Sequence, residues 1–187
     1  MALLSAVVTL AGYVPYVRLI LMDATVKPNR ASWFVWWVID CSMAFVTFSA
    51  HEWSAFALFG CFSIGTTTVL ALSLKKGEGQ FSRSDMFYVL LALVGIILWR
   101  TSDNIDVSIV ANMFAATMGT LPTIKKSYHD PESEDQLTWM LFWVGGLLNT
   151  LAITNWTFVS AAPTVCIWIM QWGINFGLIL GRRKKKE

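Results

Sequence analysis

The chain has 187 residues, of which 56% are hydrophobic and 14% are charged, and its net charge is +2. A chain of this length and apolarity is filled by membrane-length helices and their links, which leaves no room for a separate soluble domain. Its basic residues flank apolar stretches instead of forming one patch, so a nucleic-acid partner is excluded.

Apolar stretches between charged breaks predict the helices, because charge is costly in hydrocarbon. Most of these stretches are near the roughly 20 residues that a membrane helix needs. The seven predicted helices cover residues 2–22, 32–50, 53–74, 86–99, 107–124, 137–154 and 157–180.

The distribution of basic residues predicts the orientation. If the links are numbered alternately, one side collects 13 of the 14 basic residues and the other side only Arg100. By the positive-inside rule, the number of spans is odd, the amino terminus lies outside and the carboxy terminus lies in the cytoplasm. The expected location is therefore the cell (inner) membrane, as a multi-pass protein.

An internal repeat relates the two halves of the chain. Residues 12–18 (GYVPYVR) align with residues 119–125 (GTLPTIK), and one deleted residue later Trp33 and Trp37 pair with Trp139 and Trp143. Both copies run in the same direction across the membrane, so an odd number of connecting helices, here one, must separate the two triplets. We expect a first triple-helix repeat at 1–80, a linker helix within 81–103, and a second repeat with a basic tail at 104–187.

Two parallel triplets joined by one helix, with a proline in the first helix of each triplet and a basic loop after it, resemble the SWEET sugar transporters and the wider PQ-loop superfamily. The family's proline is followed by glutamine, whereas here Tyr16 follows Pro15 and Thr123 follows Pro122. The strings KPNRASW at 27–33 and DPESE at 130–134 look more like small uncharacterised bacterial membrane proteins of this type. The resemblance implies an all-α, SWEET-like membrane fold in a 3+1+3 arrangement. Because a seventh-helix asparagine binds sugar in such proteins, the resemblance also makes Asn175 a candidate for the site.

Asp40 is the acidic residue inside a predicted span. It lies about seven residues into the second helix, or about 10 Å deep at ~1.5 Å per residue. An ionised carboxylate there costs roughly 2.5 to 3.5 kcal/mol, so it should face a partner or a wet cavity. Its role is either proton coupling or binding of a polar or cationic solute. The alternative is a protonated acid bonded to a neighbouring helix.

Amides on the last three predicted helices could bind hydroxyl or amide groups of a solute, since an amide both donates and accepts. Trp168 and Trp172 share a helix face with two of them and would add an aromatic wall. Interhelical hydrogen bonding and core packing are the alternatives. With Asp40, the predicted substrate-binding residues are Asn112, Asn149, Trp168, Gln171, Trp172 and Asn175.

Other residues have predicted mechanical or structural roles. Pro15 and Pro122 are either hinges between the triplets or static kinks. Trp37 and Trp143 either close the pocket from the cytoplasmic side as a gate or, as the favoured alternative, pack in the core. Acidic residues 130–135 are expected to form a solvated loop. Tryptophans at helix ends are expected in an interfacial aromatic belt, namely Trp33, Trp36, Trp53, Trp99, Trp139 and Trp156.

The sequence predicts that the protein is not an enzyme and needs no metal or cofactor. His51 and His129 fall on opposite sides of the membrane, and no glycine-rich phosphate loop precedes a lysine. The predicted function is transport of a small polar, sugar-like solute by alternating access, passive or proton-coupled. Alternatives are a vitamin or nucleoside carrier similar to nicotinamide riboside transporters, and a non-transporting SWEET-fold membrane receptor. The expected partners are the solute and the lipid bilayer, with a homo-oligomer as an option.

Overall fold

The computed structural model describes residues 1–22, 26–76, 86–87, 90, 93–94, 97–98 and 100–185. Within these residues the regular elements are all helical, and no strand is present. The helices are α1 (Ala2–Met22), α2 (Arg30–Ser49), α3 (Trp53–Lys76), α5 (Ile105–His129), the short 3-10 helix η1 (Pro131–Ser133), α6 (Gln136–Leu151) and α7 (Phe158–Lys184).

Five of the described helices are long and apolar enough to cross a membrane: α1, α2, α3, α5 and α7. This confirms an all-helical chain with the character of a multi-pass membrane protein. Helix α6 has 16 residues and ends at Leu151, three residues before the predicted end, so it is shorter than the other five. Half of the predicted helix at 86–99, and about half of the linker at 81–103, lies outside the described residues. The count of seven spans therefore stays a prediction.

Helix starts follow from short polar caps at equivalent places in the two halves. Asn29 caps α2 by accepting a hydrogen bond from the backbone N–H of Ser32 at 3.1 Å. Asp135 caps α6 in the same way, accepting from the N–H of Thr138 at 2.8 Å. Such caps satisfy backbone donors that have no partner inside the helix. The buried tryptophan that follows each cap by four residues is therefore held at the same helical position in both halves.

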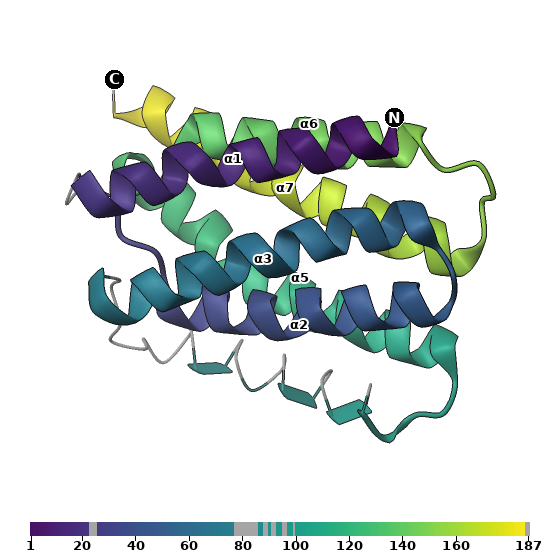
Figure 1. Cartoon of the computed structure of the whole chain (residues 1–187). Helices are drawn as coiled ribbons and strands as arrows, with labels where there is room; N and C mark the ends of the chain where they lie inside the picture. Colours follow the sequence, from purple (N-terminus) through teal and green to yellow (C-terminus); the bar gives the residue numbers. More distant parts are fainter. Residues whose placement is uncertain are drawn as a thin grey trace.

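The six helices pack as a closed ring in the order α1, α3, α2, α5, α7, α6, and α6 returns to α1 (Figure 1). Helix α3 lies between α1 and α2, and α7 lies between α5 and α6 in the same way. The two sets of three meet at the α1–α6 and α2–α5 contacts. Each contact therefore has a counterpart in the other set, as the sequence repeat predicts.

Glycines bring the two sets of helices into close contact at both junctions. A Cβ atom on Gly12 of α1 would lie 2.7 Å from the ring of Phe142 on α6. A Cβ atom on the equivalent Gly119 of α5 would lie 2.7 Å from Val35 on α2. Small residues at such positions let membrane helices approach closely.

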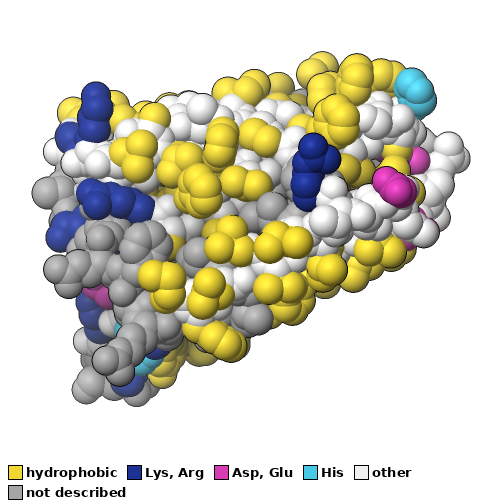
Figure 2. Space-filling model, turned by 90° about the horizontal axis from the view of Figure 1, so that it is seen from below, with side chains coloured by type: hydrophobic (Ala, Val, Ile, Leu, Met, Phe, Trp, Pro, Cys, Tyr) yellow, Lys and Arg dark blue, Asp and Glu magenta, His cyan; other side chains and the backbone are white. Residues whose placement is uncertain are grey.

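The outer surface has the distribution expected of a membrane protein. Hydrophobic side chains cover the flank of the bundle, and Lys and Arg side chains gather at one end (Figure 2). This basic end is where α1, α3, α5 and α7 finish, and the termini lie at opposite ends (Figure 1). Figure 2 shows acidic side chains at the other end, where α1, α3, α5 and α7 begin.

Candidate functional site

A cavity of about 50 Å³ lies inside the ring of helices. This volume holds a few water molecules and is far below the roughly 300–1,000 Å³ of pockets that enclose drug-sized ligands. All six helices of the ring line it, and α6 contributes Trp139 and Phe142. Its polar lining consists of Asp40 from α2, Thr66 from α3, Thr120 from α5 and Gln171 from α7, together with the Tyr13 hydroxyl from α1.

Asp40 and Gln171 are the two sequence-predicted site residues that meet in this cavity. Asp40 is 3% exposed and Gln171 is 4% exposed. The repeat places Gly146 at the position equivalent to Asp40, and a Cβ atom on Gly146 would lie 3.0 Å from the Gln171 side-chain oxygen. The second half therefore has no acid there, and the missing side chain leaves room for the amide of Gln171. The oxygen Oε1 of this amide has no hydrogen-bond partner among the residues that the structure describes.

Six aromatic side chains surround the polar groups and touch one another in a closed cycle, which we call the aromatic cycle. Successive ring centroids lie 6.4, 5.1, 5.8, 5.6, 5.8 and 6.4 Å apart. These spacings are those of packed aromatic pairs. In order, the members are Tyr13, Trp33, Trp36, Trp139, Phe142 and Phe62.

Three members of this cycle correct the sequence prediction of an interfacial belt. Trp33 is 2% exposed and Trp139 is 4% exposed, and Trp36 also lines the cavity. They lie inside the ring because α2 and α6 turn this face toward the centre. The signal that could have found them is the repeat itself, since it pairs Trp33 with Trp139. Trp53 and Trp156, in contrast, are 57% and 66% exposed, so their place in a belt stays a prediction, and Trp99 lies outside the described residues.

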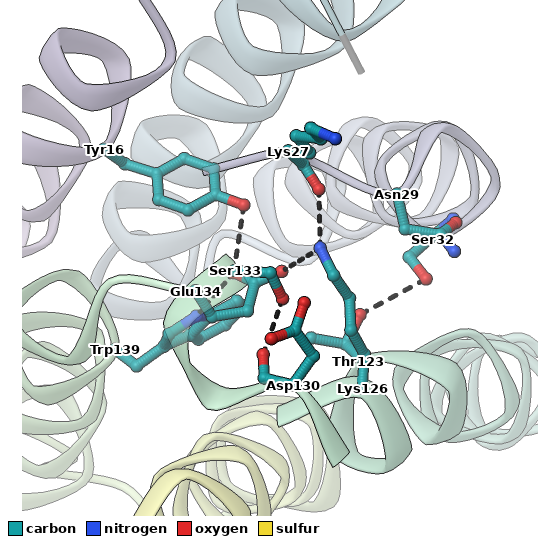
Figure 3. Close-up of polar contacts among 10 residues, drawn as sticks. All are labelled: Tyr16, Lys27, Asn29, Ser32, Thr123, Lys126, Asp130, Ser133, Glu134 and Trp139. Carbon is teal, nitrogen blue, oxygen red and sulfur yellow. Dashed lines mark hydrogen bonds and ion pairs between the residues drawn. The ribbon is translucent and has the colours of Figure 1, made fainter. Parts of the chain in front are cut away.

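A second polar cluster lies beside the cavity at the basic end, and we call it the Glu134 network (Figure 3). Tyr16 and Trp139 donate hydrogen bonds to one Glu134 oxygen at 3.0 and 3.1 Å. The Lys126 ammonium contacts the other oxygen at 3.2 Å and donates to the backbone carbonyl of Lys27 at 2.5 Å. The network therefore joins α1 and the α1–α2 link to the second set of helices.

The burial of Glu134 contradicts the prediction of a solvated acidic loop at 130–135. Its side chain is 1% exposed, whereas the Asp130 side chain is 61% exposed. Burial of a carboxylate is tolerated when it is paired and hydrogen-bonded, and Glu134 has three donors. The loop thus carries one structural acid next to exposed ones.

An apolar cluster covers the cavity on the side away from the Glu134 network. Ile39 and Ala116 belong to both the cluster and the cavity wall. Behind them, Met43 and Phe59 are 1% and 2% exposed. The cavity thus has a polar layer on its basic side and an apolar layer on the other side.

The other predicted amides lie outside the cavity and bind neighbouring helices. Asn112 accepts from the Ser42 hydroxyl at 3.0 Å and donates to the Ser108 carbonyl. Asn149 accepts from Ser54 at 3.2 Å and donates to Thr164 at 3.4 Å.

Asn175 lies next to the site without lining the cavity. Its amide donates to the backbone carbonyls of Trp139 and Gln171, both at 2.9 Å, while its own side-chain oxygen has no partner within the described part of the chain. It therefore supports two residues that do line the cavity.

The remaining tryptophans predicted for the site or the gate also lie outside the cavity. Trp172 is 53% exposed and stacks on Phe176 on the outer surface. Trp168 packs against Trp143, with ring centroids 6.0 Å apart. Trp37 donates to the Thr67 hydroxyl at 2.9 Å.

Both predicted hinge prolines lie inside continuous helices. Pro15 is half-buried within α1, and Pro122 is buried within α5. Each lies one residue before a side chain at the junction between the halves. Tyr16 binds Glu134, and the equivalent Thr123 donates to the Ser32 hydroxyl at 3.3 Å. Their role as hinges stays a prediction.

No model of a known protein family matches the chain, and neither a curated protein nor a solved structure does.

Proposed function

We propose that the protein is a membrane transporter that moves a small polar solute by alternating access, passively or coupled to protons. The observation that carries the proposal is the internal cavity that Asp40 and Gln171 both line. This cavity lies inside a ring that is built from two equivalent sets of helices. Carriers with repeated halves place their solute sites at the interface between the repeats. The 3+1+3 arrangement resembling the SWEET and PQ-loop proteins is part of this proposal.

The polar and apolar layers on the two sides of the cavity determine which contacts must separate at each step of the proposed transport cycle. Opening toward the basic end requires separation of Tyr16 and Glu134, whose polar groups water can satisfy once they part. Opening toward the other end requires separation of the apolar layer around Met43 and Phe59. Because the cavity holds only a few waters, a larger solute enters only when one of these layers parts. Proline removes a backbone hydrogen bond in α1 and in α5 next to these contacts, which suits a hinge there.

The basic end is the cytoplasmic end in this proposal, since the basic residues gather there. The protein then lies in the cell (inner) membrane with its amino terminus outside. Transport powered by a proton gradient would use Asp40 as the proton-binding group, because this carboxyl lies in the cavity.

A ligand screen followed by flux measurements tests the proposal. A bound solute stabilises the folded protein by mass action, so its melting temperature should rise with solute concentration. We would screen sugars, nucleosides, vitamins, amino acids and amines, and then measure counterflow of each stabilising compound in proteoliposomes. Saturable counterflow that Gln171→Leu reduces and Asn149→Ala retains supports transport. A ligand that binds without any flux would instead indicate a membrane receptor.

A further inference from the structure

We propose that the cavity selects a small organic cation, with Asp40 as its counter-ion and the aromatic cycle as its cage. This inference rests on the proposed carrier function for the movement of the solute, and it names the chemical class of that solute. Its basis is the balance of hydrogen-bond donors and acceptors at the cavity wall, together with the arrangement of the aromatic rings.

The hydroxyl protons at the cavity wall are already donated to the protein. The Thr66 hydroxyl lies 2.8 Å from the Phe62 carbonyl and is also hydrogen-bonded to the Asp40 side chain. Tyr13 donates to the Phe62 carbonyl at 3.4 Å. Thr120 donates to the Ala116 carbonyl at 2.7 Å. These three hydroxyls can therefore offer a solute only their lone pairs.

The indole N–H groups of the aromatic cycle are also engaged. Trp36 donates to Thr120 at 3.1 Å, and Trp139 donates to Glu134 at 3.1 Å. Trp33 is hydrogen-bonded to Tyr16. All three tryptophans thus line the cavity with their N–H groups already bound to the protein.

The groups at the cavity wall that remain free to bind a solute are mainly hydrogen-bond acceptors. The Asp40 carboxyl is hydrogen-bonded to Thr66 and keeps further lone pairs, and Oε1 of Gln171 has no partner among the described residues, so both can accept hydrogen bonds from a solute. The side-chain NH2 of Gln171 is a donor at the wall. No Lys, Arg or His is among the described residues that line the cavity. A sugar needs donors as well as acceptors around its hydroxyl groups, whereas a cation needs acceptors and negative charge.

The aromatic rings that line the same cavity as Asp40 strengthen this selection. Ring faces attract cations through their quadrupole, and tryptophan does so best, which is how aromatic cages hold ammonium groups. Three of the six rings in the cycle are tryptophans. A cation at the centre would also supply the counter-charge that a carboxylate at this depth needs.

Matched pairs of charged and neutral compounds test the inference by thermal unfolding in a non-ionic detergent. Guanidinium is compared at millimolar concentration with urea, and choline with its neutral carbon isostere. We expect the cations to raise the melting temperature and the neutral partners to leave it unchanged. Guanidinium carries N–H donors and choline's ammonium carries none, so their relative effects separate the acceptors from the aromatic rings as the source of binding.

Substitutions of cavity residues test whether the cations bind in the cavity. Asp40→Asn keeps the shape and removes the charge, and it should weaken cation binding about tenfold or more. Glu132→Gln removes the same charge from an exposed position and is the control. Trp36→Leu should lower the affinity for choline without creating affinity for the neutral isostere. If Asp40→Asn fails to fold, Trp36→Leu still decides the outcome.

Failure of this inference can be told apart from failure of the proposed transport. Stabilisation by sugars but not by cations, or equal binding of cations by Asp40→Asn, overturns the cation site. Saturable sugar counterflow in the same vesicles would leave transport standing. Cation binding that depends on Asp40, without flux of labelled guanidinium under an inside-negative potential, supports the site and contradicts transport.

Discussion

Tyr16 on α1 donates a hydrogen bond of 3.0 Å to Glu134, which follows it by 118 residues and lies in the other half of the chain. Both residues are buried, and Tyr16 also packs its ring on Trp33 with centroids 5.3 Å apart. The Tyr16 side chain therefore connects the Glu134 network, which closes the basic end, to Trp33 in the wall of the cavity.

Replacing Tyr16 by Phe tests the strength of this link. The change removes one of three donors from a buried acid, so we expect a loss of about 1 to 3 kcal/mol in the free energy of unfolding. Tyr128→Phe is the control, because the Tyr128 hydroxyl has no hydrogen bond in the described part of the chain and its ring can still contact Lys184. Equal unfolding midpoints for Tyr16→Phe and Tyr128→Phe would show that the hydroxyl is not a structural tie.

The ion pair between Lys126 and Glu134 predicts strong coupling in a double-mutant cycle. The Lys126 side chain is 16% exposed and that of Glu134 is 1% exposed, so removing one partner leaves a poorly solvated charge. Lys126→Met alone should cost about 3 kcal/mol or more, and the added Glu134→Gln change should restore part of it. Chemical unfolding of the four proteins measures the coupling, and simple additivity would contradict a direct pair.

Close contact at the junctions predicts that added methyl groups are poorly tolerated there. Gly12→Ala and Gly119→Ala each place a Cβ atom 2.7 Å from a side-chain carbon of the other set of helices, and each should lower stability by about 1 to 3 kcal/mol. Gly60→Ala meets no atom of the described residues within 4 Å and should be neutral or stabilising. Thermal unfolding of the three variants decides the point. A loss for Gly60→Ala as large as for the other two would mean that helix geometry, and not the junction, is responsible.

Asn149 and Gln171 should respond differently to substitution. Asn149 links Ser54 and Thr164 across helices, so Asn149→Ala should lower stability by about 1 kcal/mol without changing solute affinity. Gln171→Leu removes an oxygen that has no partner in the described residues, so it should lower affinity with little loss of stability. Unfolding and ligand-binding curves for both variants provide the comparison. The opposite pattern would move the binding site from the central cavity toward Asn149.

Much of the helical layout could be predicted from the sequence, because hydropathy and charge define where membrane helices begin and end. The repeat pairs Gly12 with Gly119 and Trp33 with Trp139, and these pairs occupy equivalent places in the ring. The site was less predictable. Asp40 stood out because a carboxylate is rare in an apolar helix, and Gln171 because an amide near the middle of a span needs a partner.

Rotation of the helices about their axes could not be read from the sequence. Every side of a membrane helix is apolar, so periodicity does not tell an inward Trp33 from an outward Trp172. The burial of Glu134 depends on Lys126 and Tyr16, which folding brings to it from other elements. Its position in a short acidic link predicts exposure, and only the tertiary contacts reverse it.

Distances between spin labels at the two ends test alternating access most directly. In a variant without native cysteines, one pair replaces the exposed, repeat-equivalent Arg18 and Lys125 at the basic end, and the other replaces Leu3 and Val110 at the opposite end. Alternating access predicts that Glu134→Ala, by breaking the network, shifts the basic-end distances to longer values while the opposite pair stays the same or shortens. Unchanged distances at both ends, or lengthening at both together, would contradict a carrier that opens one side at a time.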